Sequence, residues 1–349
     1  MTNQEVINQY FKESAKTTLE QYTEGAINLT FHLTVEEDGV KKDYKLQKMN
    51  PMFSVSLVQD IDFITKHLTS KNFPTPEVVR TLKGELFVRD GASWWRVLTY
   101  LPGKALNSIE SVEQAKEAGR LVGHFHTALL GCNYKFQFKL PHYRGADFYM
   151  KDLKRLLKEQ NKTPKYEALK EVGEGILSAY DDLVIKETSP KILPYISLKT
   201  NHALPERIIH GDLKINNVLF DETGTKAVSL IDIDTFMYGT IPVELGDALR
   251  SWCMPGGEDV EKATFSKEIY DAALAGYSSA AEFLTPAESS AIPHGVKLLA
   301  LELAAQHAID AFNEIYFTLD TLKYSNLFEQ NKKRAENQLN FYKEFSKVF

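Results

Sequence analysis

The sequence has only two cysteines, Cys132 and Cys253, and they stand far apart. Neither lies in a Cys-x-x-Cys motif or beside a pair of histidines. A disulfide scaffold is therefore excluded, and a structural zinc site is not expected. Two isolated thiols suit a reducing compartment.

The sequence also lacks an excess of positive charge, a basic block and a long apolar run. Its 41 Lys and Arg residues are outnumbered by 47 Asp and Glu residues, for a net charge of −6. We therefore expect no general binding to nucleic acid or to anionic membranes. No window of about 18 apolar residues predicts a membrane span. The first residues, MTNQEVINQYF, lack the basic and apolar regions of a secretory signal, so a cytoplasmic protein is expected.

What is present is an ordinary globular composition in a chain of 349 residues, which corresponds to roughly two domains. The pattern changes near residue 100, from strands and turns to mostly helices. We predict a boundary at this point, with an N-terminal part at 1–100 and a C-terminal part at 101–349.

Two hairpins are predicted in the first hundred residues, because Asp38-Gly39 and Asp90-Gly91 each separate two strand-like runs. An apolar stripe predicts a helix at 55–69 between them. Further strands are expected near 77–82, 206–210, 217–221 and 227–232, a loop at 189–206, and helices at 111–130, 146–159, 164–186, 258–277, 286–315 and 324–347.

The segment 208–252 carries the chemistry. His210-Gly211-Asp212 follows a short apolar strand, Asn217 comes five residues later, and Asp232 ends a second apolar strand. A turn at 222–224 predicts a hairpin that brings Asn217 and Asp232 together. An amide and a carboxylate suit Mg²⁺ bound with a nucleotide.

Asp212 is a candidate to accept the proton of a substrate hydroxyl, and Lys214 to neutralise a transferring phosphoryl group. Asp234 is expected either to touch substrate or metal or to cap a turn. Asp247 is expected to open a helix as a structural acid, and His210 is expected to be structural.

HGDLKINN resembles the catalytic loop of the protein-kinase-like superfamily, and LID resembles its metal-binding segment. Gly211 in place of Arg resembles the aminoglycoside phosphotransferase and choline kinase branch. Within it, HGDLKINNVLFDE, IDIDT, GDALR, GAINLTF, YKLQKMN and WRVLTYLPG resemble the N-acetylhexosamine 1-kinases. The resemblance implies a two-lobed α+β fold, with a small β-rich N-lobe, a larger helical C-lobe and ATP in the cleft between them.

By this resemblance, Asp212 is the catalytic base, and Asn217 and Asp232 are Mg²⁺ ligands. Lys48 would hold the ATP phosphates, with Lys45, on the other face of the strand, as its rival. The remaining nucleotide contacts would be Leu46 against adenine, the phosphate loop with Gly25, Asn28 and Thr30, and the hinge from Thr99 to Leu101.

Two departures from the family pattern stand out. The helix after the strand lysine offers Gln59 or Asp60 where the family has Glu, so Asp60 substitutes or the ion pair is absent. In 302–317, Gln306 or His307 stands where the family has Arg.

The sequence therefore predicts a kinase that uses ATP and Mg²⁺ to phosphorylate a small-molecule hydroxyl, best the anomeric hydroxyl of an N-acetylhexosamine. One alternative keeps the fold and changes the acceptor to choline, an aminoglycoside, homoserine or another small alcohol. The other alternative is a kinase-like module that binds nucleotide without catalysis.

Overall fold

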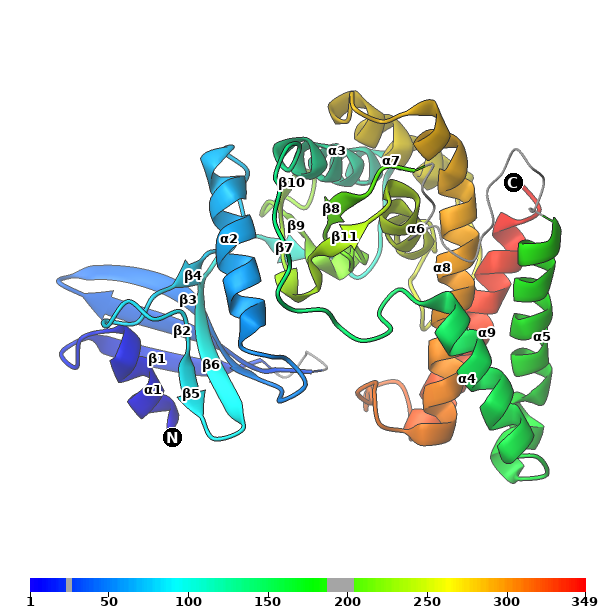
Figure 1. Ribbon diagram of the computed structural model, residues 1–349, viewed down its shortest axis with the longest axis horizontal. Helices are drawn as coiled ribbons and strands as arrows, with labels where there is room; N and C mark the ends of the chain where they lie inside the picture. The colour runs from blue at the N-terminus through cyan, green and yellow to red at the C-terminus, as the bar shows by residue number, and fades with distance from the viewer. Residues whose placement is uncertain (23–26, 187–203) are drawn as a thin grey trace. The chain divides into compact units, whose positions relative to one another are not determined.

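The computed structural model describes residues 1–22, 27–186 and 204–349 (Figure 1). They form two units. Unit 1 comprises Met1–Gly103, Gly131–Leu140 and Ser229–Phe236, and unit 2 comprises Lys104–Leu130, Pro141–Val228 and Met237–Phe349. Most of the loop predicted at 189–206 lies outside the described residues.

Unit 1 is built on an antiparallel sheet with the strand order β1-β2-β3-β6-β4, with β5 paired to β6. The strands are β1 (Lys16–Gln21), β2 (Leu29–Glu37), β3 (Val40–Met49), β4 (Val78–Val79), β5 (Val88–Asp90) and β6 (Ser93–Thr99). Both predicted hairpins are confirmed. At the first turn Asp38 and Gly39 have φ of 52° and 79°, the left-handed values that a tight hairpin needs.

Two helices accompany this sheet: the predicted α2 (Ser56–Ser70) and an unpredicted α1 (Asn3–Tyr10). Thr2 and Glu5 form a capping box at the start of α1, a signal that is readable in the sequence. Val6, Ile7 and Tyr10 of α1 share a core with inward residues of β2, β3 and β6. Burying this apolar surface holds α1 on one face of the sheet.

Unit 2 is mostly helical. Its helices are α3 (Val112–Ala128), α4 (Ala146–Glu159), α5 (Pro164–Lys186), α6 (Ile241–Trp252), α7 (Lys267–Ala280), α8 (Pro286–Asn313) and α9 (Leu327–Phe345). The predicted helices at 146–159 and 164–186 are found with those bounds. Helix α8 packs against α4, α5, α6 and α9, and α3 packs against α7. The core therefore lies around α8, which is apolar on most of its circumference.

Helices α6 and α8 cross at Gly246 and Gly295. A Cβ atom on Gly295 would lie 1.8 Å from the carbonyl oxygen of Pro242, and one on Gly246 would lie 2.5 Å from the backbone of Gly295. Only glycine allows the two backbones to come this close. This crossing fixes α6, which carries the residues that hold the candidate site.

Two helix predictions are wrong at their N-terminal ends. Residues 258–266 are turns, and α7 begins only at Lys267, where the Ser266 side chain caps it. Asp247 does not open a helix, because α6 already begins at Ile241 with a proline in its first turn. Asp247 therefore lies inside α6.

Short strands complete the fold. β8 (Arg207–Ile209) pairs with β11 (Met237–Gly239), and β9 (Val218–Phe220) lies between β7 (Lys104–Ala105) and β10 (Ala227–Leu230). Over the described residues, no helix is both long and apolar enough to cross a membrane.

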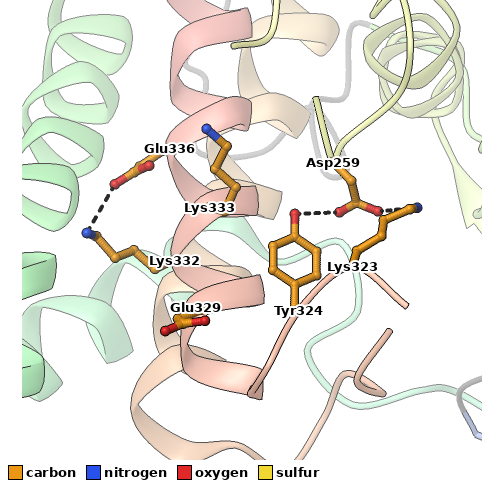
Figure 2. A pocket seen from close by; sticks show the side chains of 7 residues that line it. All are labelled: Asp259, Lys323, Tyr324, Glu329, Lys332, Lys333 and Glu336. Carbon is orange, nitrogen blue, oxygen red and sulfur yellow. Dashed lines mark hydrogen bonds and ion pairs between the residues drawn. The ribbon is translucent and has the colours of Figure 1, made fainter. Parts of the chain in front are cut away.

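Unit 2 also has an open surface hollow beside α9, lined by Asp259, Lys323, Tyr324, Glu329, Lys332, Lys333 and Glu336 (Figure 2). Its charged side chains pair with one another, as Lys323 does with Asp259 and Lys332 with Glu336. None of the predicted site residues lines it.

Candidate active site

Asp212 lies on a loop that joins β8 to the short 3₁₀ helix η2 (Ile215–Asn217). Gly211 has φ of 85°, a left-handed conformation that favours glycine. The chain therefore turns sharply between the buried Ile209 and Asp212, as the His-Gly-Asp sequence predicts.

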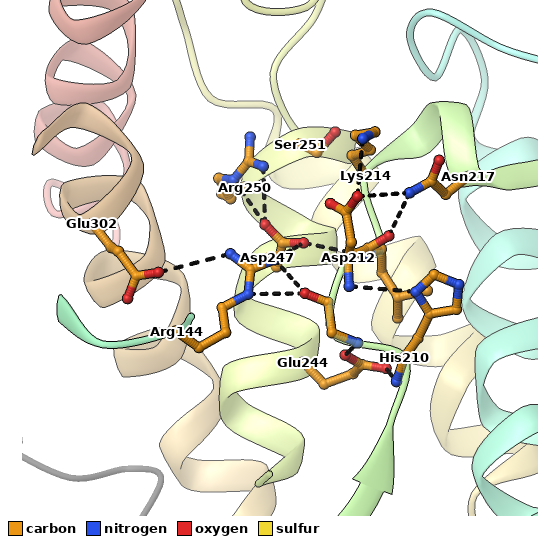
Figure 3. A network of polar contacts seen from close by, with 12 residues as sticks. Arg144, His210, Asp212, Lys214, Asn217, Glu244, Asp247, Arg250, Ser251 and Glu302 are labelled. Carbon is orange, nitrogen blue, oxygen red and sulfur yellow. Dashed lines mark hydrogen bonds and ion pairs between the residues drawn. The ribbon is translucent and has the colours of Figure 1, made fainter. Parts of the chain in front are cut away.

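Side chains of α6 hold the backbone of this loop (Figure 3). Glu244 accepts hydrogen bonds from the N–H groups of His210 and Gly211 at 2.7 and 2.9 Å, and Asp247 accepts one from Leu213 at 3.0 Å. Burial alone would raise the pKa of Glu244, but the hydrogen bond and charge of His126, the charge of His210 and the hydrogen bond from Gly211 together outweigh burial, so the pKa is lowered. The expected structural role of Asp247 is thus found, from an interior helix position.

Arg144 joins the same network from the segment before α4 (Figure 3). Its guanidinium donates to the carbonyl oxygen of Gly211 at 2.9 and 2.5 Å and lies 2.6 Å from Asp247. Its side chain is only 6 % exposed. A buried cation that is paired and hydrogen-bonded in this way fixes the loop at the residue before Asp212.

Asp212, Lys214 and Asn217 come together, as the sequence predicts. The Asp212 carboxylate lies 2.9 Å from Lys214 Nζ and accepts a hydrogen bond from Asn217 Nδ2 at 3.0 Å. Burial alone would raise the pKa of Asp212, but the positive charges of Lys214 and Arg144 outweigh it, so the pKa is lowered. The carboxylate is therefore ionised at neutral pH and can accept a proton.

Asp232 and Asp234 flank the start of a second 3₁₀ helix, η3 (Ile233–Thr235), in unit 1. Asp232 is exposed and has φ of 62° and ψ of 56°, a left-handed conformation that is uncommon outside glycine. Asp234 is buried, and Arg96 Nη2 lies 2.6 Å from its carboxylate.

The strand β3 presents its two lysines on opposite faces. Lys48 lies 3.0 Å from Asp90 and over the ring of Trp95, and it shares its face with Leu46. Leu46 is fully buried in the core beneath α1, which argues against a contact with adenine. Lys45 shares the other face with Gln47. Burial raises the pKa of Asp234 overall, with the charge of Asp232 acting in the same direction, while the charges of Arg96 and Lys45 lower it.

Of the two alternatives for the missing glutamate, the contacts of Asp60 favour an absent ion pair. Its carboxylate accepts hydrogen bonds from Tyr134 Oη, Gln137 N and Phe138 N, at 2.8, 2.9 and 2.8 Å. These contacts hold residues 131–140 on unit 1, and the partner of Lys48 is Asp90.

The other predicted nucleotide contacts are as follows. Gly25 lies outside the described residues. Asn28 Nδ2 donates to Asp234, and Thr30 Oγ1 accepts from Gln47 Nε2 at 3.1 Å. Thr99 ends β6, where its hydroxyl accepts a hydrogen bond from the N–H of Glu77, and Leu101 follows outside the strand.

Two tyrosines near Asp212 were not singled out in the sequence: Tyr143 and Tyr316. Tyr143 Oη donates to the carbonyl oxygen of Gly211 at 2.9 Å. Burial, followed by the charge of Asp212, raises the pKa of Tyr316. Its backbone N–H donates to the buried Asp310, which also receives the N–H groups of its two neighbours. No local pattern marks these tyrosines, because only the tertiary fold brings them to Asp212.

A sequence model described as the phosphotransferase enzyme family matches residues 18–283. The chain belongs to this family. The match spans most of unit 1 and the loop of Asp212. The phosphotransferase activity expected from the sequence is therefore confirmed at the level of the reaction class.

Solved structures of this phosphotransferase's fold include an aminoglycoside phosphotransferase from Alicyclobacillus acidocaldarius, with 13 % identity, a TM-score of 0.60, and coverage of 100 % of this chain and 96 % of that one. A choline kinase from Cryptosporidium parvum has 13 % identity, a TM-score of 0.62, and coverage of 95 % and 89 %. An amicoumacin kinase in complex with AMP-PNP, Ca²⁺ and Ami has 15 % identity, a TM-score of 0.61, and coverage of 97 % and 93 %. The predicted kinase-like α+β fold is confirmed.

Proposed function

We propose that this phosphotransferase transfers the γ-phosphoryl group of ATP to a hydroxyl of a small molecule, with Asp212 as the base. The observation that carries the proposal is the loop geometry. Lys214 Nζ and Asn217 Nδ2 lie 2.9 and 3.0 Å from the ionised Asp212 carboxylate. The next residue, Leu213, donates its backbone N–H to Asp247 of α6. Phosphoryl transfer needs positioning, charge neutralisation and one proton acceptor, and this loop supplies all three.

The residues of the chain suit Mg²⁺. Asn217 uses its Nδ2 in both hydrogen bonds to Asp212, which leaves its amide oxygen directed elsewhere. Asp232 offers an exposed carboxylate. Amide and carboxylate oxygens are the ligands this hard cation takes, so we propose these two residues as its ligands. When bound, Mg²⁺ would neutralise charge on the phosphates.

For the phosphates of ATP, we propose Lys45 as the lysine that contacts them, with Asn28 and Thr30 beside it. Lys45 shares a sheet face with Gln47 and acts electrostatically on Asp234, whereas Lys48 is bound to Asp90 on the other face. Backbone groups from Thr99 to Leu101 would bind adenine. ATP as donor and two free cysteines favour a cytoplasmic location.

For the acceptor, we propose a neutral sugar, best the anomeric hydroxyl of an N-acetylhexosamine, as the sequence resemblance implies. The side chains near Asp212 support an acceptor rich in hydroxyl groups. The charge of Arg144 is paired with Asp247 at 2.6 Å, and a tyrosine hydroxyl such as that of Tyr316 can exchange hydrogen bonds with a polyol.

The test is ADP release by the purified protein with Mg-ATP and N-acetylglucosamine, N-acetylgalactosamine, choline or an aminoglycoside. We expect release with a sugar and not with the cations, and loss of release in Asp212→Asn. Phosphorus NMR of the product would identify the modified oxygen.

Release with choline or an aminoglycoside alone would refute the sugar proposal and keep the kinase. ATP binding without release across a broad panel of alcohols would refute catalysis and favour a nucleotide-binding module.

A further inference from the structure

Asp234 connects three segments of unit 1 through one buried carboxylate. Its Oδ1 lies 2.6 Å from Arg96 Nη2 of β6, and its Oδ2 accepts a hydrogen bond from Asn28 Nδ2 at 3.2 Å. The Asn28 side-chain oxygen in turn accepts the N–H of Asn50 at 2.9 Å. Asp234 is 6 % exposed. One oxygen of Asp234 is therefore in ion-pair contact with Arg96, and the other accepts a hydrogen bond from Asn28.

The position of Arg96 is fixed by the sheet. Arg96 stands opposite Gln47 in the pairing of β3 with β6, and its Nε and Nη2 donate to Gln47 Oε1 at 3.0 and 2.8 Å. The guanidinium is planar and 2 % exposed. Because two neighbouring strands hold it, Arg96 presents its charge to Asp234 in one orientation.

The segment that Asp234 anchors contains a backbone conformation that needs support. Asp232, two residues earlier, has φ of 62°. A residue other than glycine in this region persists only when its surroundings enforce it. Ile233 between them is buried, and Asp234 is bound to Arg96.

We propose that Arg96 and Asp234 form a buried positioning pair that holds Asp232 and Asn28 in place for Mg-ATP, an inference that rests on the proposed function. In this proposal Asp234 is a positioning residue, because it is buried against Arg96 and Asn28. Asp232, which is exposed, would supply the carboxylate for the cation.

The test measures the affinity for ATP by calorimetry, once with Mg²⁺ and once with EDTA, in Arg96→Met, Asp234→Asn and the double variant. Loss of a residue that supports a metal ligand costs about 10–100-fold in metal-dependent affinity. We expect a loss of about tenfold or more in affinity for Mg-ATP, and a clearly smaller loss for ATP in EDTA, where only the phosphate contact of Asn28 is disturbed.

The double variant separates positioning from stability. It leaves neither buried charge alone, so we expect it to melt higher than either single variant while its Mg-ATP affinity stays low. The matched control is Asp60→Asn, a buried carboxylate of the same unit that holds residues 131–140. We expect Asp60→Asn to lower the melting temperature and to leave Mg-ATP affinity unchanged.

Three outcomes overturn the inference. They are wild-type Mg-ATP affinity in the single variants, an equal loss with Mg²⁺ and with EDTA, and recovery of affinity in the double variant. The proposed function fails separately if the wild-type protein shows the expected binding pattern but transfers no phosphoryl group. A wild-type protein that does not bind Mg-ATP refutes both.

Discussion

Replacing Asp247 by Asn should destabilise unit 2 strongly, because this carboxylate is the buried counter-charge of two guanidinium groups. Arg144 Nη2 lies 2.6 Å and Arg250 Nη2 2.9 Å from its oxygens, and all three side chains are at most 6 % exposed. Asn keeps the shape and one acceptor for the N–H of Leu213 but removes the charge.

Breaking a buried ion pair from one side costs about 3–5 kcal/mol. That is a large part of the roughly 5–15 kcal/mol that stabilises a typical domain. We therefore expect the free energy of unfolding of Asp247→Asn, from urea titration at pH 7, to fall by about 3–5 kcal/mol. Because the loop of Asp212 is tied to Asp247, we also expect kcat to fall by about 10–100-fold.

The control is Asp271→Asn, which breaks an exposed ion pair of 2.6 Å with Lys267 on α7. An exposed pair contributes about 0–1 kcal/mol. Arg250 still pairs with Glu258 at 2.7 Å, whereas the other carboxylate near Arg144, that of Glu302, lies 4.0 Å away. Adding Arg144→Met to Asp247→Asn therefore removes the less compensated cation and should restore part of the stability. If Asp247→Asn unfolds at the same urea concentration as the control, the reasoning from buried charge is refuted.

Three further outcomes are expected. Gly295→Ala places a methyl group against a backbone carbonyl of α6 and should cost about 1–3 kcal/mol in urea unfolding; an unchanged midpoint would refute the close crossing. Burial alone would raise the pKa of Glu288, but the hydrogen bonds from Arg207 and Thr285 together outweigh burial, so the folded pKa is lowered. The free energy of unfolding of the wild-type protein should thus exceed that of Glu288→Gln most above about pH 5, and the difference should shrink as pH falls. A difference between the two proteins that grows in acid would contradict this. Lys45→Met should raise the KM for ATP far more than Lys48→Met, and the reverse order would return the phosphate role to Lys48.

Local sequence predicted the parts of the fold that depend on local physics. Asp38-Gly39 and Asp90-Gly91 each supply the backbone freedom of a tight turn, and both hairpins form. The apolar stripe of α2 predicted its helix because burial of one face follows a period of 3.6 residues. The predicted start of the helix at 258–277 is wrong because turn and helix propensities differ too little over a few residues to locate a boundary.

Side-chain partners required the tertiary structure. Asp60 has the right type and spacing to pair with Lys48, but it holds residues 131–140 instead. Arg144, Tyr143 and Tyr316 reach the Asp212 loop from segments distant in the chain.

The sequence by itself determined the reaction class, because Asp212, Lys214 and Asn217 stand close together in one short loop. The local fold of that loop brings their side chains into contact. Only the tertiary structure decided which charges surround that loop and which face of β3 each lysine occupies relative to Asp234. Those contacts join residues far apart in the chain, and their pairing depends on how the sheet and helices pack, which no local pattern encodes.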